Sequence, residues 1–339
     1  MGERGFRPAL TQFLQAGAKN FAVFLDFSKK KAVVKVVVKV GRQKDLGSKK
    51  REGLFGPTNL FGYFMILPAM SVLFFFFAYP LTFEIWTSLT DATLGNDAKF
   101  VGVDNYIKLF ADPEFLTAAK NSVVYVSFVQ AGKFILGLGI AILLHQKLVA
   151  RGFWRAVVLV PYAMPGFVAF MVWKLIYNPD VGALNIFLTK TGITDAPIAF
   201  LGDRTWAMAS VIFATIWRGF PFWAIMFLAA LQAVPKELYE AAAVDGANAW
   251  HRFRNISLPG IRPVILIVFM LSTINTINSF EAIWLTTAGG PSDATVILPV
   301  FAYKGLATFQ IGESAAAALS MVPVAIVIAI FLLNKLKKD

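Results

Sequence analysis

The chain has 339 residues, of which 57% are hydrophobic and 15% are charged, and its formal net charge is +12. The mean hydropathy of +0.64 is typical of a polytopic membrane protein and excludes an ordinary soluble domain. The sequence contains no Cys, which excludes disulfides and thiolate metal sites, and its two His have no close Asp or Glu cluster.

The first 58 residues form a basic arm. Up to Arg51 the arm contains thirteen Lys and Arg against three Asp and Glu. Apolar residues from Leu10 to Leu25 predict an amphipathic helix on the membrane surface. The Val run after Lys31 is interrupted by too many Lys to span a bilayer. Binding to nucleic acid is the alternative for such an arm, and the adjoining membrane domain favours contact with anionic lipid instead.

Six apolar stretches follow, each long enough to cross a bilayer as a helix, which takes ~20 residues. They predict an all-α membrane protein with one six-helix transmembrane domain, residues 59–339, preceded by the basic amphipathic N-terminal arm, residues 1–58. Pro161, Pro165 and Pro221 lie inside the stretches, where freed backbone groups must face protein or a cavity. The predicted spans are roughly residues 59–80, 118–144, 153–176, 205–233, 261–285 and 314–333.

Lys and Arg in the loops predict the orientation of the chain. With a cytoplasmic N-terminus, the cytoplasmic segments after the arm contain ten Lys and Arg, and the outer loops contain five. Both termini and the loop between the fourth and fifth spans are therefore predicted to be cytoplasmic. The sequence therefore predicts a multi-pass protein of a cytoplasmic (inner) membrane.

The loop at residues 235–259 is predicted to contain two short helices. Pro235 suits the first turn of a helix, and Gly246 allows the backbone to turn after it. A second helix is expected to begin at Asn248 and to stop before Pro259. Two helices broken at a Gly are typical of a knob that docks on a partner; a solvated loop is the alternative.

Polar and charged residues within the spans have two interpretations. Four of them share one face of the fifth span, where they either bond to neighbouring helices or face a hydroxyl-rich ligand: Ser272, Asn275, Thr276 and Ser279. Lys133, Arg218 and Glu281 either line a polar path or form internal ion pairs and packing contacts. Aromatic residues such as Phe222 either stack on sugar rings or pack against other helices. Gly137 and Gly139 indicate close helix packing.

No feature of the sequence indicates an enzyme. It has no Gly-x-x-x-x-Gly-Lys-Ser/Thr phosphate loop and no evident pair of nucleophile and base. No catalytic, cofactor-binding or metal-binding residue is therefore predicted. If transport requires ATP, another chain must bind it.

The loop at 235–259 resembles the EAA motif of ABC-importer permeases. The motif is Glu-Ala-Ala, three residues, Gly, nine residues, then Ile-x-Leu-Pro, and it runs here from Glu240 to Pro259. The resemblance implies that this loop is the coupling helix, which fits a cleft in a separate ATPase subunit. The coupling residues that it implies are Glu240, Ala241, Ala242, Asp245, Gly246, Phe253, Leu258 and Pro259.

Five further stretches resemble carbohydrate-importer permeases of the maltose type: residues 100–106, 161–165, 178–185, 219–222 and 287–291. This resemblance implies the type I permease fold in a bacterial or archaeal membrane. It also implies a heterodimer with a second permease, two ATPase subunits that bind ATP and Mg²⁺, and an extracytoplasmic sugar-binding protein. The substrate path that it implies, with Arg218 and Glu281 added for their charge, is Gly219, Phe222, Ser272, Asn275, Thr276, Ser279, Arg218 and Glu281.

The alternatives are a permease for another small polar solute such as a glycerol phosphate or a polyol, a secondary transporter or channel, and a membrane scaffold. A secondary carrier usually shows internal repeats and ion-coupling residues within one chain. A scaffold gives no reason for the EAA spacing. The sequence therefore favours an importer permease.

Overall fold

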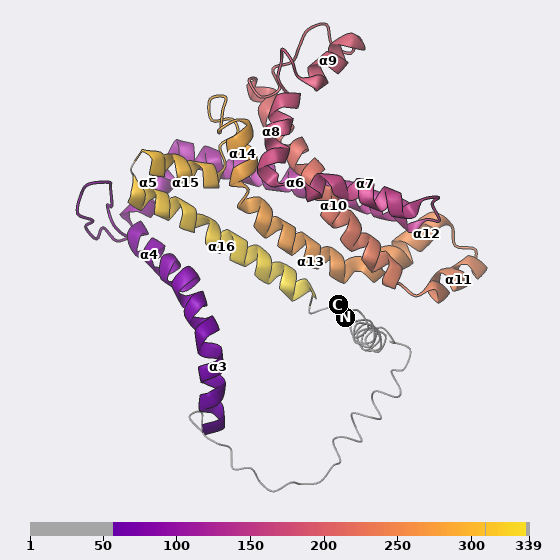
Figure 1. Ribbon diagram of the computed structural model, residues 1–339, viewed down its shortest axis with the longest axis horizontal. Helices are drawn as coiled ribbons and strands as arrows, with labels where there is room; N and C mark the ends of the chain where they lie inside the picture. The colour runs from indigo at the N-terminus through magenta and orange to yellow at the C-terminus, as the bar shows by residue number, and fades with distance from the viewer. Residues whose placement is uncertain (1–56, 309, 337–339) are drawn as a thin grey trace, which may run out of the picture. The chain divides into compact units, whose positions relative to one another are not determined.

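The computed structural model describes residues 57–308 and 310–336, so the predicted basic arm, residues 1–58, lies outside the described residues except for its last two. The described residues form helices joined by loops (Figure 1). They contain no β-strand, only two isolated bridges, Thr90 with Phe100 and Thr93 with Gln310. By its contacts the chain divides into two parts, Met1–Val72 and Leu73–Asp339.

Of the first part, the structure describes residues 57–72, which belong to α3, Pro57–Leu73, an apolar helix with Pro68 inside it. Helical backbone continues from α3 through a π-helical turn, Phe74–Ala78, into α4, Tyr79–Ser88. The predicted end of this span at residue 80 is wrong. Pro80 lies in the first turn of α4, where a residue without an N–H is tolerated.

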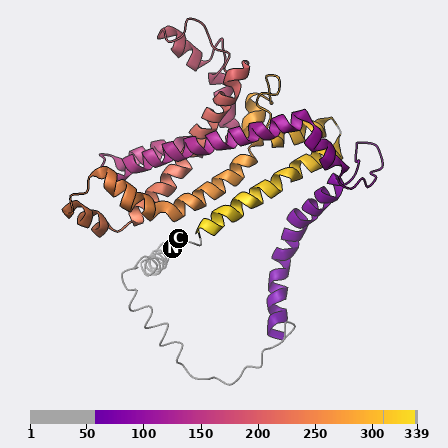
Figure 2. The same ribbon diagram turned by 180° about the vertical axis from the view of Figure 1, so that it is seen from behind.

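Four long helices of the second part pack side by side: α6, Pro113–His145; α10, Arg204–Ala233; α13, Leu258–Ile277; and α16, Ile311–Leu336 (Figures 1 and 2). Small residues bring α6 and α10 together. A Cβ on Gly137 would collide with Trp223, so the close packing predicted there is confirmed. Gly139 has no atom within 4 Å of such a Cβ, so the same prediction is wrong for Gly139.

The third predicted span, 153–176, is not one straight helix. It consists of α7, Arg151–Ala163, and α8, Gly166–Ile176, which meet at 90°. Met164 is extended at the break, because the residue before a proline avoids helical backbone. Pro221, by contrast, lies within the unbroken helix α10. Figure 1 shows α7 lying along α10 and α8 turning away from it.

The fifth predicted span, 261–285, is wrong at both ends. At its start, α12, Ala249–Arg252, passes through a π-helical turn, Phe253–Ser257, directly into α13. The second knob helix therefore does not stop before Pro259, which lies in the first turn of α13. At its other end α13 finishes at Ile277, and the separate helix α14, Phe280–Thr286, contains Glu281.

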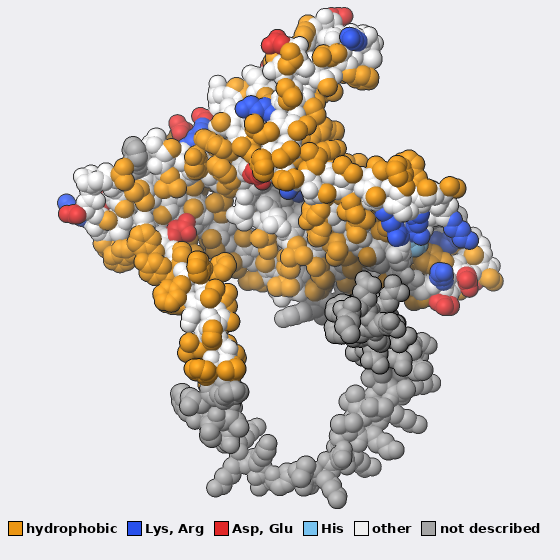
Figure 3. Space-filling model, viewed as in Figure 1, with side chains coloured by type: hydrophobic (Ala, Val, Ile, Leu, Met, Phe, Trp, Pro, Cys, Tyr) orange, Lys and Arg blue, Asp and Glu red, His pale blue; other side chains and the backbone are white. Residues whose placement is uncertain are grey.

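The remaining helices are short. They are α5, Asp104–Ala111; α9, Ala183–Lys190; α11, Lys236–Val244; and α15, Leu298–Ala307. Lys and Arg gather where α7, α11 and α12 meet, whereas apolar side chains cover much of the rest of the visible face (Figure 3). This distribution matches the positive loops predicted for the cytoplasmic side.

Five helices of the described residues are long and apolar enough to cross a membrane, and the number rises to six if the bent pair α7–α8 is counted as one span. The predicted all-α membrane fold with six spans is therefore confirmed. The five are Gly62–Ser88, Pro113–His145, Arg204–Ala233, Ala249–Ile277 and Ile311–Leu336.

Candidate functional site

An exposed knob of two short helices joins α10 to α13. Its first helix, α11, begins after Pro235 and ends at Val244, and the exposed Asp245 follows as its C-cap. Gly246 follows with φ +73°, a left-handed backbone that favours glycine, so the predicted turn at this residue is confirmed. The carboxamide oxygen of Asn248 then caps α12 by accepting a hydrogen bond from the His251 N–H at 2.9 Å.

Large apolar side chains project from the knob instead of packing inside it. Val244 is 88% exposed, Trp250 is 64% exposed and Leu238 is 50% exposed. Exposed apolar side chains of this size at a charged end of the molecule are typical of a surface for a protein partner. Tyr239 Oη and Ser257 Oγ lie 2.9 Å apart and hold α11 against the start of α13.

The predicted coupling residues fall into two groups. Glu240, Ala241, Asp245 and Gly246 are exposed on α11 and its end, where a partner can reach them. Three others lie at the base of the knob: Phe253 and Leu258 are partly buried, and Pro259 is exposed in the first turn of α13. Ala242 is partly buried on α11. Their role in coupling remains a prediction.

A polar cavity of about 750 Å³ lies among α6, the break between α7 and α8, α10, α13 and α14. The structure brings all eight predicted substrate-path residues to its walls, although they come from three different helices and the α13–α14 turn. Lys133 also lines it, as the polar-path interpretation of its charge expects, and so do three residues that the substrate-path prediction did not include: Tyr162, Thr215 and Asn278. The prediction that a proline break faces a cavity is confirmed at Pro165, which lines the same wall.

One wall of the cavity is aromatic. The rings of Tyr162 and Phe222 are stacked, with centroids 6.0 Å apart and planes at 23°. Tyr162 reaches this wall because α7 ends at the bend, and Phe222 comes from α10 one turn after Arg218. A flat aromatic face of this kind suits the apolar face of a sugar ring.

The polar face of α13 is divided between structure and cavity. Ser272 accepts a hydrogen bond from Trp223 Nε1 at 3.1 Å and donates one to Gln130 Oε1 at 2.9 Å. Gln130 Nε2 in turn donates to Thr273 Oγ1 at 2.6 Å. This buried network bonds α6, α10 and α13 together, as the helix-bonding interpretation predicted.

Thr276 and Ser279 also have partners within the bundle. Lys133 Nζ donates to Thr276 Oγ1 at 3.1 Å, and Tyr125 Oη donates to Ser279 Oγ at 3.1 Å. Asn275 differs from them, because it is exposed and its amide nitrogen bonds only to the Leu271 carbonyl of its own helix. Asn275 therefore has an amide oxygen available to a ligand.

Lys133, Arg218 and Glu281 face the same cavity without forming ion pairs with one another in the described part of the chain. The alternative of an internal ion pair is therefore wrong. Lys133 is 7% exposed and lies over Gly219, where a Cβ would collide with its side chain. Arg218 lies 6.0 Å from the centroid of the Phe170 ring, and its buried Nε finds no hydrogen-bond partner among the described residues.

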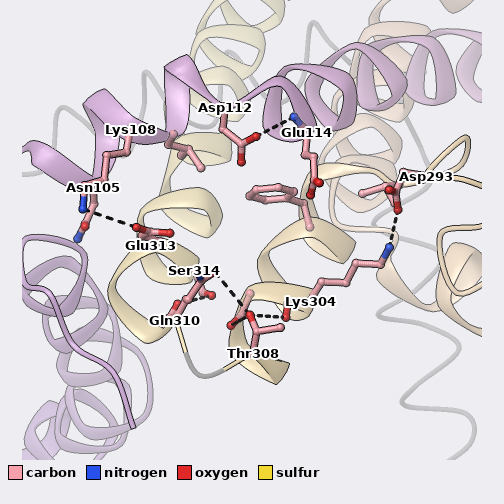
Figure 4. A pocket seen from close by; sticks show the side chains of 14 residues that line it. Asn105, Lys108, Asp112, Glu114, Asp293, Lys304, Thr308, Gln310, Glu313 and Ser314 are labelled. Carbon is pink, nitrogen blue, oxygen red and sulfur yellow. Dashed lines mark hydrogen bonds and ion pairs between the residues drawn. The ribbon is translucent and has the colours of Figure 1, made fainter. Parts of the chain in front are cut away.

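A second polar cavity, of about 450 Å³, lies between α5, the start of α6, α15 and the start of α16 (Figure 4). Lys304 Nζ contacts Asp293 Oδ1 at 2.7 Å on its rim, and Lys108 Nζ lies 3.8 Å from Glu313 Oε1. These elements belong to the loops predicted to be outside the membrane. On the predicted orientation, this cavity lies on the outer side of the membrane, apart from the cavity among α6, α10 and α13.

A helical membrane bundle with a polar cavity, whose walls α10 and α13 are joined by an exposed knob, defines the transmembrane subunit of a transporter. Residues 133–336 match the family described as binding-protein-dependent transport system inner membrane component, and the chain belongs to this family. The family is a transport component, as predicted, and does not consist of enzymes.

Two of the similar proteins have substrates in their names. The chain is 37% identical over 257 residues to the trehalose/maltose transport system permease protein MalF of Thermococcus litoralis. The matched region covers 75% of this chain and 86% of that protein. It is 30% identical over 266 residues to the sulfoquinovosyl glycerol transport system permease protein SmoG of Agrobacterium fabrum, covering 78% and 86%. The predicted relationship to carbohydrate permeases is confirmed.

A solved bacterial ABC transporter involved in the import of the acidic polysaccharide alginate has the same fold. One of its chains matches with a TM-score of 0.70 at 23% identity, over 83% of this chain and 96% of that chain. A second structure shows the alginate transporter in complex with an alginate pentasaccharide-bound periplasmic protein.

Proposed function

We propose that this chain forms half of the translocation path of an ATP-driven sugar importer. A second, related permease forms the other half, and two ATPase subunits supply ATP and Mg²⁺ binding. An extracytoplasmic protein delivers the sugar. The chain crosses the cytoplasmic membrane of a bacterium or archaeon with both termini in the cytoplasm, as the loop charges favour.

The observation that supports this function is the connection between knob and cavity. α10 carries Phe222 and α13 carries Asn275, so two walls of the cavity continue directly into the two ends of the knob. A partner that displaces the knob displaces both walls. ATP-dependent closure of the ATPase subunits therefore changes which side of the membrane the cavity faces, and hydrolysis resets it.

Two observations together support a sugar as the substrate: the residues that line the cavity and the substrates named for similar proteins. The stacked pair of Tyr162 and Phe222 offers a ring platform, and Asn275 and Asn278 offer amides that bond to hydroxyl groups. The relatives whose names give a substrate are permeases for trehalose/maltose and for sulfoquinovosyl glycerol. A glycerol phosphate or polyol would use the amides and leave the aromatic wall without a ring to contact.

Uptake and ATP hydrolysis measured on the same variants test the proposal. Asn275→Ala leaves a sugar hydroxyl unpaired at a cost of ~1–3 kcal/mol, which corresponds to a roughly ten- to hundredfold loss of affinity. We expect Asn275→Ala and Phe222→Ala to reduce sugar uptake while binding-protein-stimulated ATP hydrolysis persists.

The matched control is Phe213→Ala. Phe213 lies on α10, as Phe222 does, but contacts Trp173 away from the cavity. Uptake in this variant should stay close to that of the unmodified importer. Loss of uptake, ATP hydrolysis and complex yield together in Asn275→Ala and Phe222→Ala would contradict a sugar site in this subunit.

A further inference from the structure

The two cations of the cavity lie where charge is most costly. Lys133 is near the middle of α6, and Arg218 is near the middle of α10, in two helices that each span the membrane. A charge at this depth is costly in the hydrocarbon of a bilayer, so such residues usually face the bundle interior or a cavity, as Lys133 and Arg218 do. In the described residues neither cation lies within ion-pair distance of a carboxylate.

Hydrogen bonds within the described residues satisfy these cations only in part. Lys133 Nζ, which has three N–H donors, donates to one protein acceptor, Thr276 Oγ1. Arg218 contacts the face of Phe170, and its Nε is buried without an acceptor in the part of the chain that the structure describes. The two side chains are also close enough for their like charges to repel each other.

The carboxylate of the same cavity has another neighbour. A Cβ on Gly166, the first residue of α8, would collide with the Glu281 carboxylate. The start of a helix carries a partial positive charge, which stabilises a nearby anion. Glu281 therefore lies beside the start of α8 and outside ion-pair distance of Lys133 and Arg218.

We propose that the cavity selects a sugar that bears an anionic group and that Lys133 and Arg218 together bind this group. A carboxylate, sulfonate or phosphate brings the acceptor oxygens that both side chains lack. The aromatic pair Tyr162 and Phe222 then contacts the ring of the same sugar. This inference rests on the proposed function, since it names the substrate class of that cavity.

The absence of Cys from the chain permits a direct test of the charge. Asn278 is exposed in the cavity, and Asn278→Cys places a single thiol there. The assembled importer in lipid nanodiscs is treated with sulfonatoethyl methanethiosulfonate, an anion, and with trimethylammonioethyl methanethiosulfonate, a cation. Both reagents react with the thiolate form of the same Cys, so the fraction of thiol that is ionised affects both reaction rates equally. The ratio of the two reaction rates therefore reports the local electrostatic potential.

We expect this ratio to favour the anionic reagent about tenfold over the ratio at Val149→Cys, a 91% exposed reference in the loop after α6. Arg218→Gln and Lys133→Gln should each lower the ratio, and Glu281→Gln should raise it. High salt should reduce the difference. A ratio equal to that of the reference, or one that Arg218→Gln leaves unchanged, would overturn the proposal.

Protection by sugars separates this inference from the proposed function. The probes are D-glucuronate and D-glucose, which share a ring and differ in charge, and the reagent is the uncharged N-ethylmaleimide. We expect glucuronate to protect the thiol at a concentration about tenfold lower than glucose, and Arg218→Gln to remove this preference. Equal protection by both sugars overturns the anionic preference and leaves the sugar cavity standing. Protection by neither overturns both.

Discussion

Ser272 and Asn275 lie on one face of α13, less than one turn apart, but they have different surroundings. The Ser272 hydroxyl joins Trp223 of α10 to Gln130 of α6, whereas Asn275 is open to the cavity. In lipid, a polar side chain with two partners on other helices contributes to assembly. The polar face therefore combines a structural network with a ligand surface.

Ser272→Ala should destabilise the assembled protein. It leaves Trp223 Nε1 and Gln130 Oε1 without a buried partner, at a cost of ~1–3 kcal/mol. We expect a lower melting temperature and a lower yield of the importer complex in detergent, with uptake and ATP hydrolysis falling in parallel. Thermal unfolding of the purified complex provides the measurement.

The control for this variant is Ser320→Ala, since the Ser320 hydroxyl donates only to the Ala317 carbonyl of its own helix. Its melting temperature should stay near that of the unmodified complex. A stable Ser272→Ala complex that has lost uptake alone would show instead that this hydroxyl contacts the sugar.

At the residue scale, the sequence predicted which residues line the cavity better than it predicted which of them bond to other helices and which face a ligand. Helical spacing placed Ser272, Asn275 and Thr276 on one face, and all three line the cavity. Spacing within one helix cannot tell which hydroxyl finds a partner on another helix. Tyr162 was missed because its position at the wall depends on the 90° bend after α7, which the sequence signals only through Pro165.

At the scale of elements, the turn between the two knob helices depends on the backbone conformation of Gly246, and no other part of the described chain packs against this residue. Gly246 has φ +73°, and a Cβ at this position would meet no atom within 4 Å. A larger side chain there would therefore strain the turn without colliding with this chain. Any steric effect beyond that strain must come from the partner.

Gly246→Asp and Glu240→Lys should uncouple the importer. Aspartate at Gly246 would project from the turn into a partner's cleft, and lysine at the exposed Glu240 would reverse the charge offered to it. We expect membrane insertion to persist while uptake and binding-protein-stimulated ATP hydrolysis are lost. Both activities are measured on reconstituted complexes with equal amounts of the variant chain.

Gly192→Asp is the matched control for Gly246→Asp. Gly192 has φ +70° and equally open surroundings, so it imposes similar backbone strain away from the knob. Its importer should keep most of its activity. Normal stimulated ATP hydrolysis in both knob variants would remove the coupling role from this segment.

The sequence predicted that the long helices exist, but it did not predict where several of them begin and end. The long apolar stretches predicted α6, α10 and α16 to within a few residues. Pro80 and Pro259 were expected to end helices, but each lies just after a π-helical turn at the start of the next helix. Apolar periodicity contains no information on such turns, because the side chains on both sides remain in the same kind of environment.

At the scale of the whole molecule, the orientation in the membrane determines the role of every surface. Lys190 is the last residue of α9, in the segment after α8 that is predicted to be outside, and Arg254 lies at the base of the knob. Both are exposed. Because the chain contains no Cys, a single substitution at either position gives one reactive thiol.

Lys190→Cys should react with a membrane-impermeant thiol reagent in intact cells. Arg254→Cys should react only after the membrane is permeabilised. Labelling is read from the mass shift or fluorescence of the purified chain, and the chain without substitution provides the blank. The opposite pattern would invert every span and place the knob out of reach of a cytoplasmic ATPase.

The direct connection of α10 and α13 through α11 and α12 has a thermodynamic consequence. Two ligands that bind to the same pair of helices are linked, and their influence on each other's affinity is reciprocal. On the proposed function, the factor by which a docked ATPase alters the affinity of the cavity for sugar equals the factor by which sugar alters the affinity of the knob for that ATPase. The importer thus reports the contents of its cavity to the cytoplasm through binding equilibria alone.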